Sequence, residues 1–257
     1  AALYILSADK VFVTLAEGTE NALANGGSFI AIDENNIDAV VFSKQDLTFN
    51  GTGNLMITSP NGNGIVGKDD LVFTGGNYTI NTSSHGIEAN DSIRITGTTQ
   101  ITVDAGKDGI HCENNDDTSL GFIYISAGTL NIEAEGDGIS ASAYMQIVDG
   151  TFTVLAGGGS ENGSSQSSNT WGAFMGGDMP PGQQTSSNTA TTEDSTSMKG
   201  VKASGTLNIF SGSFQINSSD DCIHSNSSIT IYGGTFELAS GDDAVHADET
   251  LTVTACD

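Results

Sequence analysis

Apolar residues recur along this chain with a period of about 22 residues. A phrase made of a polar residue, a small residue and Ile or Val marks each repeat. Its seven copies are Asn63-Gly64-Ile65, His85-Gly86-Ile87, Asp108-Gly109-Ile110, Asp137-Gly138-Ile139, Lys199-Gly200-Val201, Asp221-Cys222-Ile223 and Asp243-Ala244-Val245. With the Ile or Val as an anchor, successive copies are 22, 23, 29, 62, 22 and 22 residues apart. The two long steps therefore contain insertions.

Within each repeat the apolar residues come in pairs that are two positions apart, such as Leu71 with Phe73 and Tyr78 with Ile80. Pairs of this kind, separated by Gly-rich turns, predict three short strands per repeat, each with one face inward. A glycine recurs between the second and third strands, where a tight corner requires positive φ. These corner glycines are Gly76, Gly97, Gly128, Gly150, Gly212 and Gly234.

A repeat of three strands cannot bury its apolar face alone, but stacked repeats bury a continuous core and pair every strand in parallel. The sequence therefore predicts an all-β fold, a right-handed parallel β-helix with about eight coils of about 22 residues. We expect a single, monomeric domain over residues 1–257. Residues 1–36 are expected to cap one end, and the Gly/Ser/Thr/Asn-rich segment 157–197 to form a long loop insertion. A shorter insertion covers residues 114–120.

The chain is strongly acidic, with 32 Asp and Glu against 7 Lys and Arg, a formal charge of -25 and a pI near 4.1. Nucleic acids and anionic membranes need a basic protein face, so both are excluded as partners, and a cation partner is favoured. No run of about 18 apolar residues occurs, so we expect no membrane insertion, and no signal peptide is recognisable. Cys112, Cys222 and Cys256 show neither zinc-site spacing nor a disulfide framework, and we expect them to be small buried apolar residues.

Equivalent positions in successive coils lie above one another, so the repeats can be compared as vertical columns. Two residues before the anchor, the column is Asn63, His85, Asp108, Asp137, Lys199, Asp221 and Asp243. Carboxylates about 5 Å apart repel by roughly 1 kcal/mol even in water, and Ca²⁺ is a natural counter-ion because it takes several oxygen ligands. The predicted metal ligands are Asp220, Asp221, Asp242 and Asp243, then Asp108, Asp137 and Glu113. The alternative is a solvated acidic edge that keeps the rod soluble.

One residue after the anchor, an outward column contains Val66, Glu88, His111, Ser140, Lys202, His224 and His246. We interpret it as a stripe that faces sugar. The predicted substrate-binding residues are Glu88, His111, Lys202, His224 and His246, with Trp171 from the long insertion. A transition metal between His224 and His246, or simply an exposed polar ladder, are the alternatives. The small residues just before the anchors are expected to leave a shallow channel for a linear polymer.

Four phrases resemble the carbohydrate-binding β-helix domain family of anaerobic biomass-degrading bacteria. They are Ser43-Lys44-Gln45-Asp46-Leu47-Thr48-Phe49, Gly64-Ile65-Val66-Gly67-Lys68-Asp69-Asp70-Leu71, Asp108-Gly109-Ile110-His111 and Asp220-Asp221-Cys222-Ile223-His224-Ser225-Asn226. The resemblance covers nearly the whole chain, from about Lys10 onward. It implies a pectate-lyase-like fold and a secreted or cell-surface protein that binds Ca²⁺ and plant cell-wall polysaccharide, either cellulose or an acidic pectin-like polymer. It does not by itself imply catalysis.

An enzymatic alternative uses Lys199 or Lys202. Pectate lyases remove the proton α to a uronate carboxylate with a Lys or Arg base while calcium neutralises that carboxylate. Lys199 interrupts the acidic column next to Asp221, and Lys202 lies beside His224. The other interpretation is that both lysines neutralise nearby carboxylates. Non-catalytic polysaccharide binding, calcium-assisted β-elimination and a purely structural surface rod are thus the three hypotheses, and the first is preferred.

Overall fold

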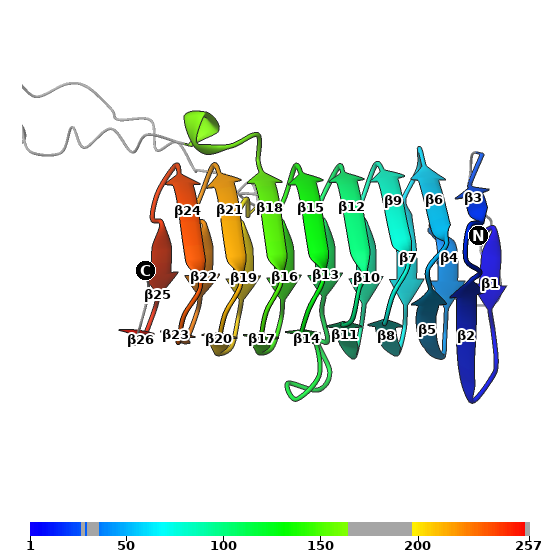
Figure 1. Ribbon diagram of the computed structural model, residues 1–257, viewed down its shortest axis with the longest axis horizontal. Coiled ribbons are helices and arrows are strands. Elements are labelled where there is room, and N and C mark those ends of the chain that lie inside the picture. The colour runs from blue at the N-terminus through cyan, green and yellow to red at the C-terminus, as the bar shows by residue number, and fades with distance from the viewer. Residues whose placement is uncertain (27–28, 30–35, 164–196, 255–257) are drawn as a thin grey trace, which may run out of the picture.

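The computed structural model describes residues 1–26, 29, 36–163 and 197–254, and it forms the predicted parallel β-helix (Figure 1). Sheet A contains β1 (Leu3–Ile5), β4 (Ala39–Ser43), β7 (Asn63–Gly67), β10 (Ile87–Ala89), β13 (Ile110–Cys112), β16 (Ile139–Ala141), β19 (Val201–Ala203), β22 (Ile223–Ser225) and β25 (Val245–Ala247). Sheet B contains β2 (Lys10–Leu15), β5 (Asp46–Gly51), β8 (Asp70–Phe73), β11 (Ser92–Ile95), β14 (Phe122–Ile125), β17 (Met145–Ile147), β20 (Leu207–Ile209), β23 (Ser228–Ile231) and β26 (Thr250–Val253). Sheet C contains β3 (Glu20–Ala24), β6 (Asn54–Ser59), β9 (Asn77–Thr82), β12 (Gln100–Ala105), β15 (Thr129–Ala134), β18 (Thr151–Ala156), β21 (Ser213–Ser218) and β24 (Thr235–Ser240).

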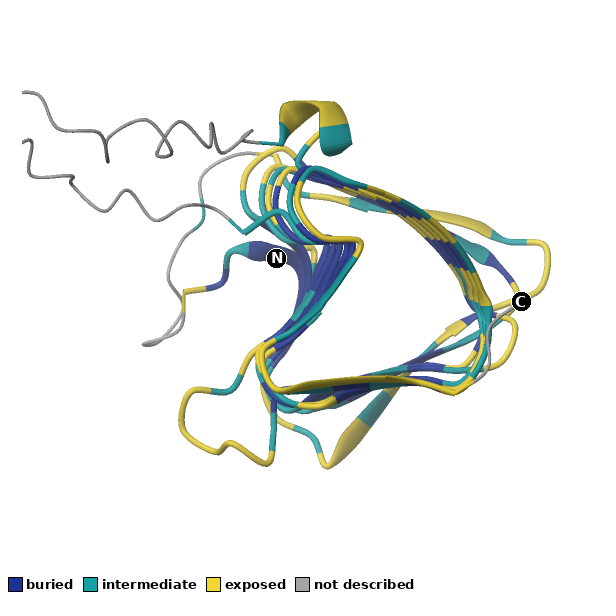
Figure 2. Ribbon diagram, turned by 90° about the vertical axis from the view of Figure 1, so that its left-hand side faces the viewer, coloured by how far each residue is buried: buried dark blue, intermediate teal, exposed yellow. Residues whose placement is uncertain are grey.

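The vertical register follows the predicted anchors. Ile65 lies opposite Ile87 in sheet A, Ile87 opposite Ile110, and the series continues through Ile139, Val201 and Ile223 to Val245. Apolar side chains that alternate along each strand fill the interior, and Figure 2, a view along the rod, shows the buried residues on the three walls that enclose this core. All six corner glycines have positive φ, between 66° and 147°, as predicted.

The N-terminal residues form a coil of their own where the sequence predicted a cap. Strands β1, β2 and β3 pair in parallel with β4, β5 and β6, so Val11 lies on Leu47 and Val13 on Phe49. The alternation of Val11 and Val13 is that of an ordinary strand, which explains the extra coil. The following segment brings Ile37 against Phe42 and Val66, which covers the outer face of sheet A at this end. Residues 27–28 and 30–35, and Trp171 with most of the long insertion, lie outside the described residues.

The sequence predicts a shallow channel along the small residues before the anchors, and this prediction is wrong. A Cβ atom added to Gly109 would lie 2.3 Å from Cγ2 of Ile132 and 2.7 Å from the carbonyl oxygen of Gly138. These glycines therefore face the interior at the corner between sheets C and A, against a β-branched side chain of the following sheet C strand. Cys222, in the same column, is fully buried. The column serves close packing, and the anchor that follows it is buried as well. The outward side chains are those of the column one residue before it and of the column two residues after it.

The two insertions leave the rod at different corners. The shorter one lies between β13 and β14, at the corner between sheets A and B. The longer one follows β18 and the short 3₁₀ helix η1 (Ser160–Asn162), at the corner between sheets C and A (Figure 1). Cys112 and Cys222 are free and buried, as expected, while Cys256 lies outside the described residues. In the described part of the chain, no helix has the length and apolar character needed to cross a membrane.

Candidate functional site on the outer face of sheet A

The acidic column forms a hydrogen-bonded ladder along the corner between sheets C and A. In four of the six steps the Oδ1 atom of one column residue accepts the backbone N–H of the column residue in the next coil, whereas His85 and Lys199 have no such oxygen. The steps are His85 to Asn63 at 3.0 Å, Asp137 to Asp108 at 2.8 Å, Lys199 to Asp137 at 2.8 Å and Asp243 to Asp221 at 3.0 Å. Column residues that the repeat period predicts to be vertical neighbours are therefore in direct contact. Part of the reason for Asp or Asn at this position is structural, because the side chain satisfies a backbone donor of the turn above it.

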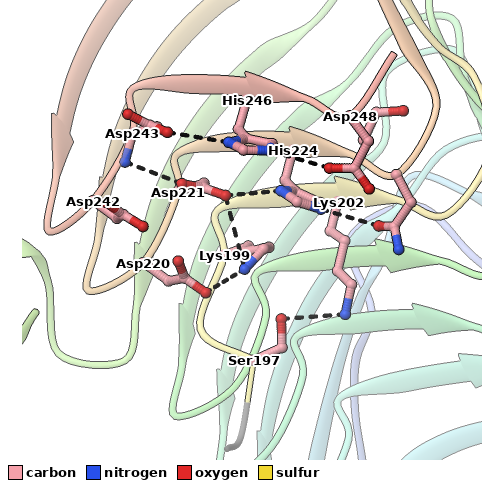
Figure 3. Close-up of polar contacts among 12 residues, drawn as sticks. Ser197, Lys199, Lys202, Asp220, Asp221, His224, Asp242, Asp243, His246 and Asp248 are labelled. Carbon is pink, nitrogen blue, oxygen red and sulfur yellow. Dashed lines mark hydrogen bonds and ion pairs between the residues drawn. The ribbon is translucent and has the colours of Figure 1, made fainter. Parts of the chain in front are cut away.

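The other carboxylate oxygens of the ladder point to lysine and histidine side chains of the protein itself (Figure 3). Lys202 Nζ lies 3.2 Å from Asp137 Oδ2, and Lys199 Nζ pairs with Asp220 and lies 3.8 Å from Asp221 Oδ2. Burial raises the pKa of Asp220, but Lys199 outweighs it and the pKa stands below its ordinary value. The chain thus supplies much of the neutralisation that the sequence assigned to calcium. For both lysines this geometry favours the charge-neutralising interpretation over that of a base.

Three of the histidines repeat one arrangement, in which Nδ1 faces an Asp three residues earlier. The Nδ1–Oδ2 distances are 2.8 Å for His111 and Asp108, 2.7 Å for His224 and Asp221, and 3.1 Å for His246 and Asp243. The Nε2 atoms face residues two positions later, at 3.4 Å for Glu113, 3.0 Å for Asn226 and 3.1 Å for Asp248. The hydrogen bond to Asp243 raises the pKa of His246. Each ring thus stands on sheet A with an Asp carboxylate near Nδ1 and a carboxylate or amide oxygen near Nε2.

His85 adds a second imidazole beside His111. The two rings stack at a centroid distance of 4.7 Å, and Nδ1 of His85 lies 3.6 Å from Oδ2 of Asp108. Burial lowers the pKa of His85, and the neighbouring His111 lowers it further. Burial also opposes a charge on His111, but Asp108 and Glu113 outweigh it and raise the pKa of His111. Asp108 is desolvated too, yet the two histidines hold the pKa of its carboxyl below the ordinary value.

A polar cavity of about 340 Å³ opens on sheet A next to these histidines. Its lining comes from the outward column, from the turn before β8 and from the shorter insertion: Lys68, His85, Glu88, Ala89, Asn90, His111, Glu113, Asn114, Asn115 and Asp116. Glu88 accepts a hydrogen bond from Asn63 at 2.9 Å and pairs with Lys68 at 3.4 Å. The cavity therefore offers charged and amide groups of both hydrogen-bonding types, which suits hydroxyl-rich ligands.

The predicted carboxylate ligands fall into two sets, those that lie close to other carboxylates and those that are paired with other partners. Oxygens of Asp220, Asp221 and Asp242 lie within 4.8 Å of one another, and Asp242 and Asp243 are exposed on the last turns. This oxygen-rich set fits Ca²⁺, with water to complete the coordination, although the Lys199 ammonium pairs with two of the carboxylates. The two oxygens of Asp221 also face the backbone N–H of Asp243 and Nδ1 of His224, so Asp220 and Asp242 are the freer ligands. Asp137 and Glu113 belong to none of the potential metal-binding groups found in the described ranges. Asp137 directs its two oxygens to Lys199 N–H and Lys202 instead.

The outward column lies as predicted, with one polar side chain per coil from Glu88 to His246 in continuous register. Sequence reasoning missed His85 as a partner of His111, and it missed Lys68, Asn114 and Asp248 altogether. His85 and His111 stand in two different columns, and the residues of one column do not reveal a contact with another. Comparing each column residue with the outward residue one coil above would have revealed the pair.

Comparison with known proteins gives three concordant matches. The model of a family described as "Carbohydrate-binding domain-containing protein" matches residues 1–244. A relative of the same description from Acetivibrio thermocellus is 36% identical over 160 residues, which are 62% of this chain and 56% of that protein. A solved structure, the gadolinium derivative of a polysaccharide lyase-like protein from C. thermocellum, is similar with a TM-score of 0.57 and 35% identity, over 60% of this chain and 63% of that one. The matched region thus spans less than two thirds of either relative.

Proposed function

The chain belongs to the family of carbohydrate-binding domain-containing proteins, and from this premise we propose that it binds an acidic, pectin-like plant cell-wall polysaccharide with the help of calcium and without catalysis. The outer face of sheet A is the proposed binding surface. We place the protein outside the cell or on its surface, where such polymers occur. Cellulose is the neutral alternative ligand, and the two polymers differ in whether calcium should matter.

The observation that carries this proposal is the register of the outward column. From β10 to β25, each coil carries one outward side chain that can hydrogen-bond or carry charge, at the spacing of about 4.8 Å between parallel strands, and all of them except the buried Ser140 reach the surface. A linear polymer lying along the rod would meet the same kind of contact again at each coil. Rigid strands hold these groups, so little ordering cost opposes binding.

The role proposed for calcium is inferred from the negative charge of the chain. A polyuronate approaching a chain with a formal charge of -25 is repelled unless cations lie between the two sets of carboxylates. Asp220, Asp221 and Asp242 are the residues that would hold the ion, and Asp242 is exposed at the end of the array. When bound, the ion would supply a positive centre that a uronate carboxylate can share.

The lyase alternative receives no support from the two lysines. A proton-abstracting amine has to reach the substrate, whereas Lys199 pairs with Asp220 and Lys202 lies 3.2 Å from Asp137 and from the hydroxyl of Ser197. Either amine would have to leave these partners before it could act. We therefore expect no unsaturated uronides, detected by ultraviolet absorbance, when polygalacturonate and calcium are added.

Calcium removal tests the proposed function. We expect binding of polygalacturonate, measured by calorimetry, to weaken at least about tenfold when EGTA replaces calcium, because the bridging cation is lost. Asp242→Asn should cause a similar loss in calcium, while Asp149→Asn, an exposed carboxylate at the corner between sheets B and C, should not. Equal binding with and without calcium, or binding of insoluble cellulose alone, would contradict the proposal for an acidic ligand.

Lys199→Gln distinguishes the two roles considered for that residue. Removing an ammonium 3.8 Å from Asp221 Oδ2 takes away a cation that competes with calcium. A single charge at this distance contributes about 1 kcal/mol in water, so we expect calcium affinity to rise about fivefold. Calcium titration by calorimetry measures this, with Lys10→Gln, which pairs with Asp46 in the first coils, as the control. Weaker calcium binding in Lys199→Gln would show that the ammonium helps to build the site.

A further inference from the structure

We propose that His85, Asp108 and His111 form a binding site for a divalent transition-metal ion of the zinc class, separate from the calcium-type carboxylates. The Nδ1 atoms of the two histidines lie 3.6 and 2.8 Å from Oδ2 of Asp108, and the three donor atoms are all within 4.8 Å of one another. Two imidazole nitrogens and one carboxylate oxygen are typical zinc ligands, whereas calcium selects oxygen alone.

Neither of the two histidine nitrogens makes a hydrogen bond of good geometry within the described ranges. Nδ1 of His85 and Nδ1 of His111 are both buried, and neither has a hydrogen-bond partner in the described part of the chain. Nδ1 of His111 lies 2.8 Å from Oδ2 of Asp108 and interacts with its charge, but this contact does not have the geometry of a hydrogen bond. Buried polar atoms are nearly always satisfied. One ion between the three donor atoms would satisfy both nitrogens at once.

Residues around the proposed ligands fix their orientation. Nε2 of His111 faces Oε2 of Glu113 at 3.4 Å, and Oδ1 of Asp108 accepts the backbone N–H of Asp137 at 2.8 Å. A carboxylate on the second nitrogen of a metal-bound histidine is common, because it sets the tautomer in which the first nitrogen carries the lone pair. Strands and the ladder therefore hold the three donors in place before an ion arrives.

The chain carries a second copy of this arrangement in which an amine stands where His85 stands. Lys199 occupies the column position below Asp221, as His85 does below Asp108, and His224 corresponds to His111. Lys199 Nζ lies 3.8 Å from Asp221 Oδ2, and Nδ1 of His224 forms a hydrogen bond of 2.7 Å with the same oxygen. In that copy an ammonium neutralises the carboxylate and the histidine is satisfied. The first copy has a second imidazole in the ammonium's place.

The position of the site suggests what the ion would do. His85 and His111 line the polar cavity of about 340 Å³, together with Glu88, Lys68 and the shorter insertion. Three protein ligands leave one position of a tetrahedral zinc ion for water or an external oxygen. A sugar hydroxyl or carboxylate that enters the cavity is the external ligand we infer.

Zinc titration of the full chain, prepared without a polyhistidine tag and without sugar, tests this site. We expect one strong site per chain, and binding at least about 100-fold weaker in His85→Lys, which copies the Lys199 arrangement, and in His111→Gln. His224→Gln and His246→Gln are matched controls that should keep the wild-type affinity. Unchanged zinc affinity in His85→Lys and His111→Gln, or an equal loss in the controls, would overturn the assignment.

Two further measurements keep the test decisive if one variant folds poorly. Zinc should raise the melting temperature of the wild type and of His224→Gln but not that of His111→Gln, and the same concentration of calcium should not displace the zinc. Co²⁺ should give the visible absorption of a tetrahedral site in the wild type and lose it in His111→Gln. A zinc site that disappears on adding calcium, or an octahedral Co²⁺ spectrum, would contradict the proposal. Because no polysaccharide is present, these results do not depend on the proposed function.

Discussion

Replacing Gly138 by alanine is expected to lower the free energy of unfolding by about 3 kcal/mol, the upper end of what overpacking costs. A Cβ at this position would lie 2.3 Å from Cγ1 of Val154 and 2.5 Å from the carbonyl oxygen of Gly200. The first contact forces a buried side chain out of its rotamer, and the second pushes the next coil away. Neither neighbour can move far, because both lie in the middle of the stack. Urea unfolding, followed by circular dichroism, measures the loss.

Gly26→Ala is the matched control, because a Cβ at Gly26 meets nothing within 4 Å and the glycine does not have positive φ. It should change stability by less than about 0.5 kcal/mol. The double change Gly138→Ala with Val154→Ala should cost less than the sum of the single changes, since truncation of Val154 removes one of the two close contacts. Equal free energies of unfolding for Gly138→Ala and the wild type would contradict this prediction, because they would mean that neighbouring coils separate without an energetic penalty.

The same column shows where sequence reasoning reached its limit. The period of the repeat located the small residues, but it could not show on which side of the wall they lie, because two successive residues face inward at this corner. The sheet C side chains that face this column explain why most of its members are glycine. Glycine stands opposite the β-branched Ile80, Val103, Ile132, Val154 and Ile216. Cys222 occurs one coil later, where the equivalent residue of β24 is Leu238, which has no branch at Cβ.

Columns were predictable because a parallel β-helix converts one sequence period into direct contact. The outward series from Glu88 to His246 and the ladder from Asn63 to Asp243 both followed from the spacing of Ile and Val. Contacts between columns were not predictable in this way. Whether His111 faces Asp108, His85 or Glu113 depends on the rotation of each side chain and on the bend of the turn. The pairs Lys199–Asp220 and Lys202–Asp137 arise from the same cause.

Charge was the second point at which the structure changed the interpretation. The spacing of the Asp residues implies repulsion among them, but the sequence does not show how much of this repulsion the protein itself relieves. Each of Asp108, Asp137, Asp221 and Asp243 has one oxygen on a histidine or lysine. Calcium is therefore expected to act mainly at the exposed end of the array, near Asp242. Along the middle coils, Lys202 and the histidines face the carboxylates instead, and the proposed transition-metal site would lie there.

Asp137→Ala should show how much the ladder contributes to stability, with an expected loss of about 3 kcal/mol. The Asp137 side chain is 3% exposed, and its two oxygens serve different partners, the backbone N–H of Lys199 at 2.8 Å and Lys202 Nζ at 3.2 Å. Alanine leaves a buried donor unpaired and an ammonium without its counter-charge. Both penalties add to the loss of the interactions themselves. The midpoint of urea unfolding, compared with the wild type, gives the size of the effect.

Asp137→Asn separates the two contributions. The amide keeps an oxygen for the N–H of Lys199 but loses the charge that faces Lys202, whose side chain is 24% exposed and can turn toward water. We therefore expect a loss of only about 1 kcal/mol, the upper end for an exposed pair. Asp149→Ala, at an exposed corner, should stay within about 0.5 kcal/mol of the wild type. If Asp137→Asn costs as much as Asp137→Ala, the ion pair and not the ladder hydrogen bond stabilises this turn.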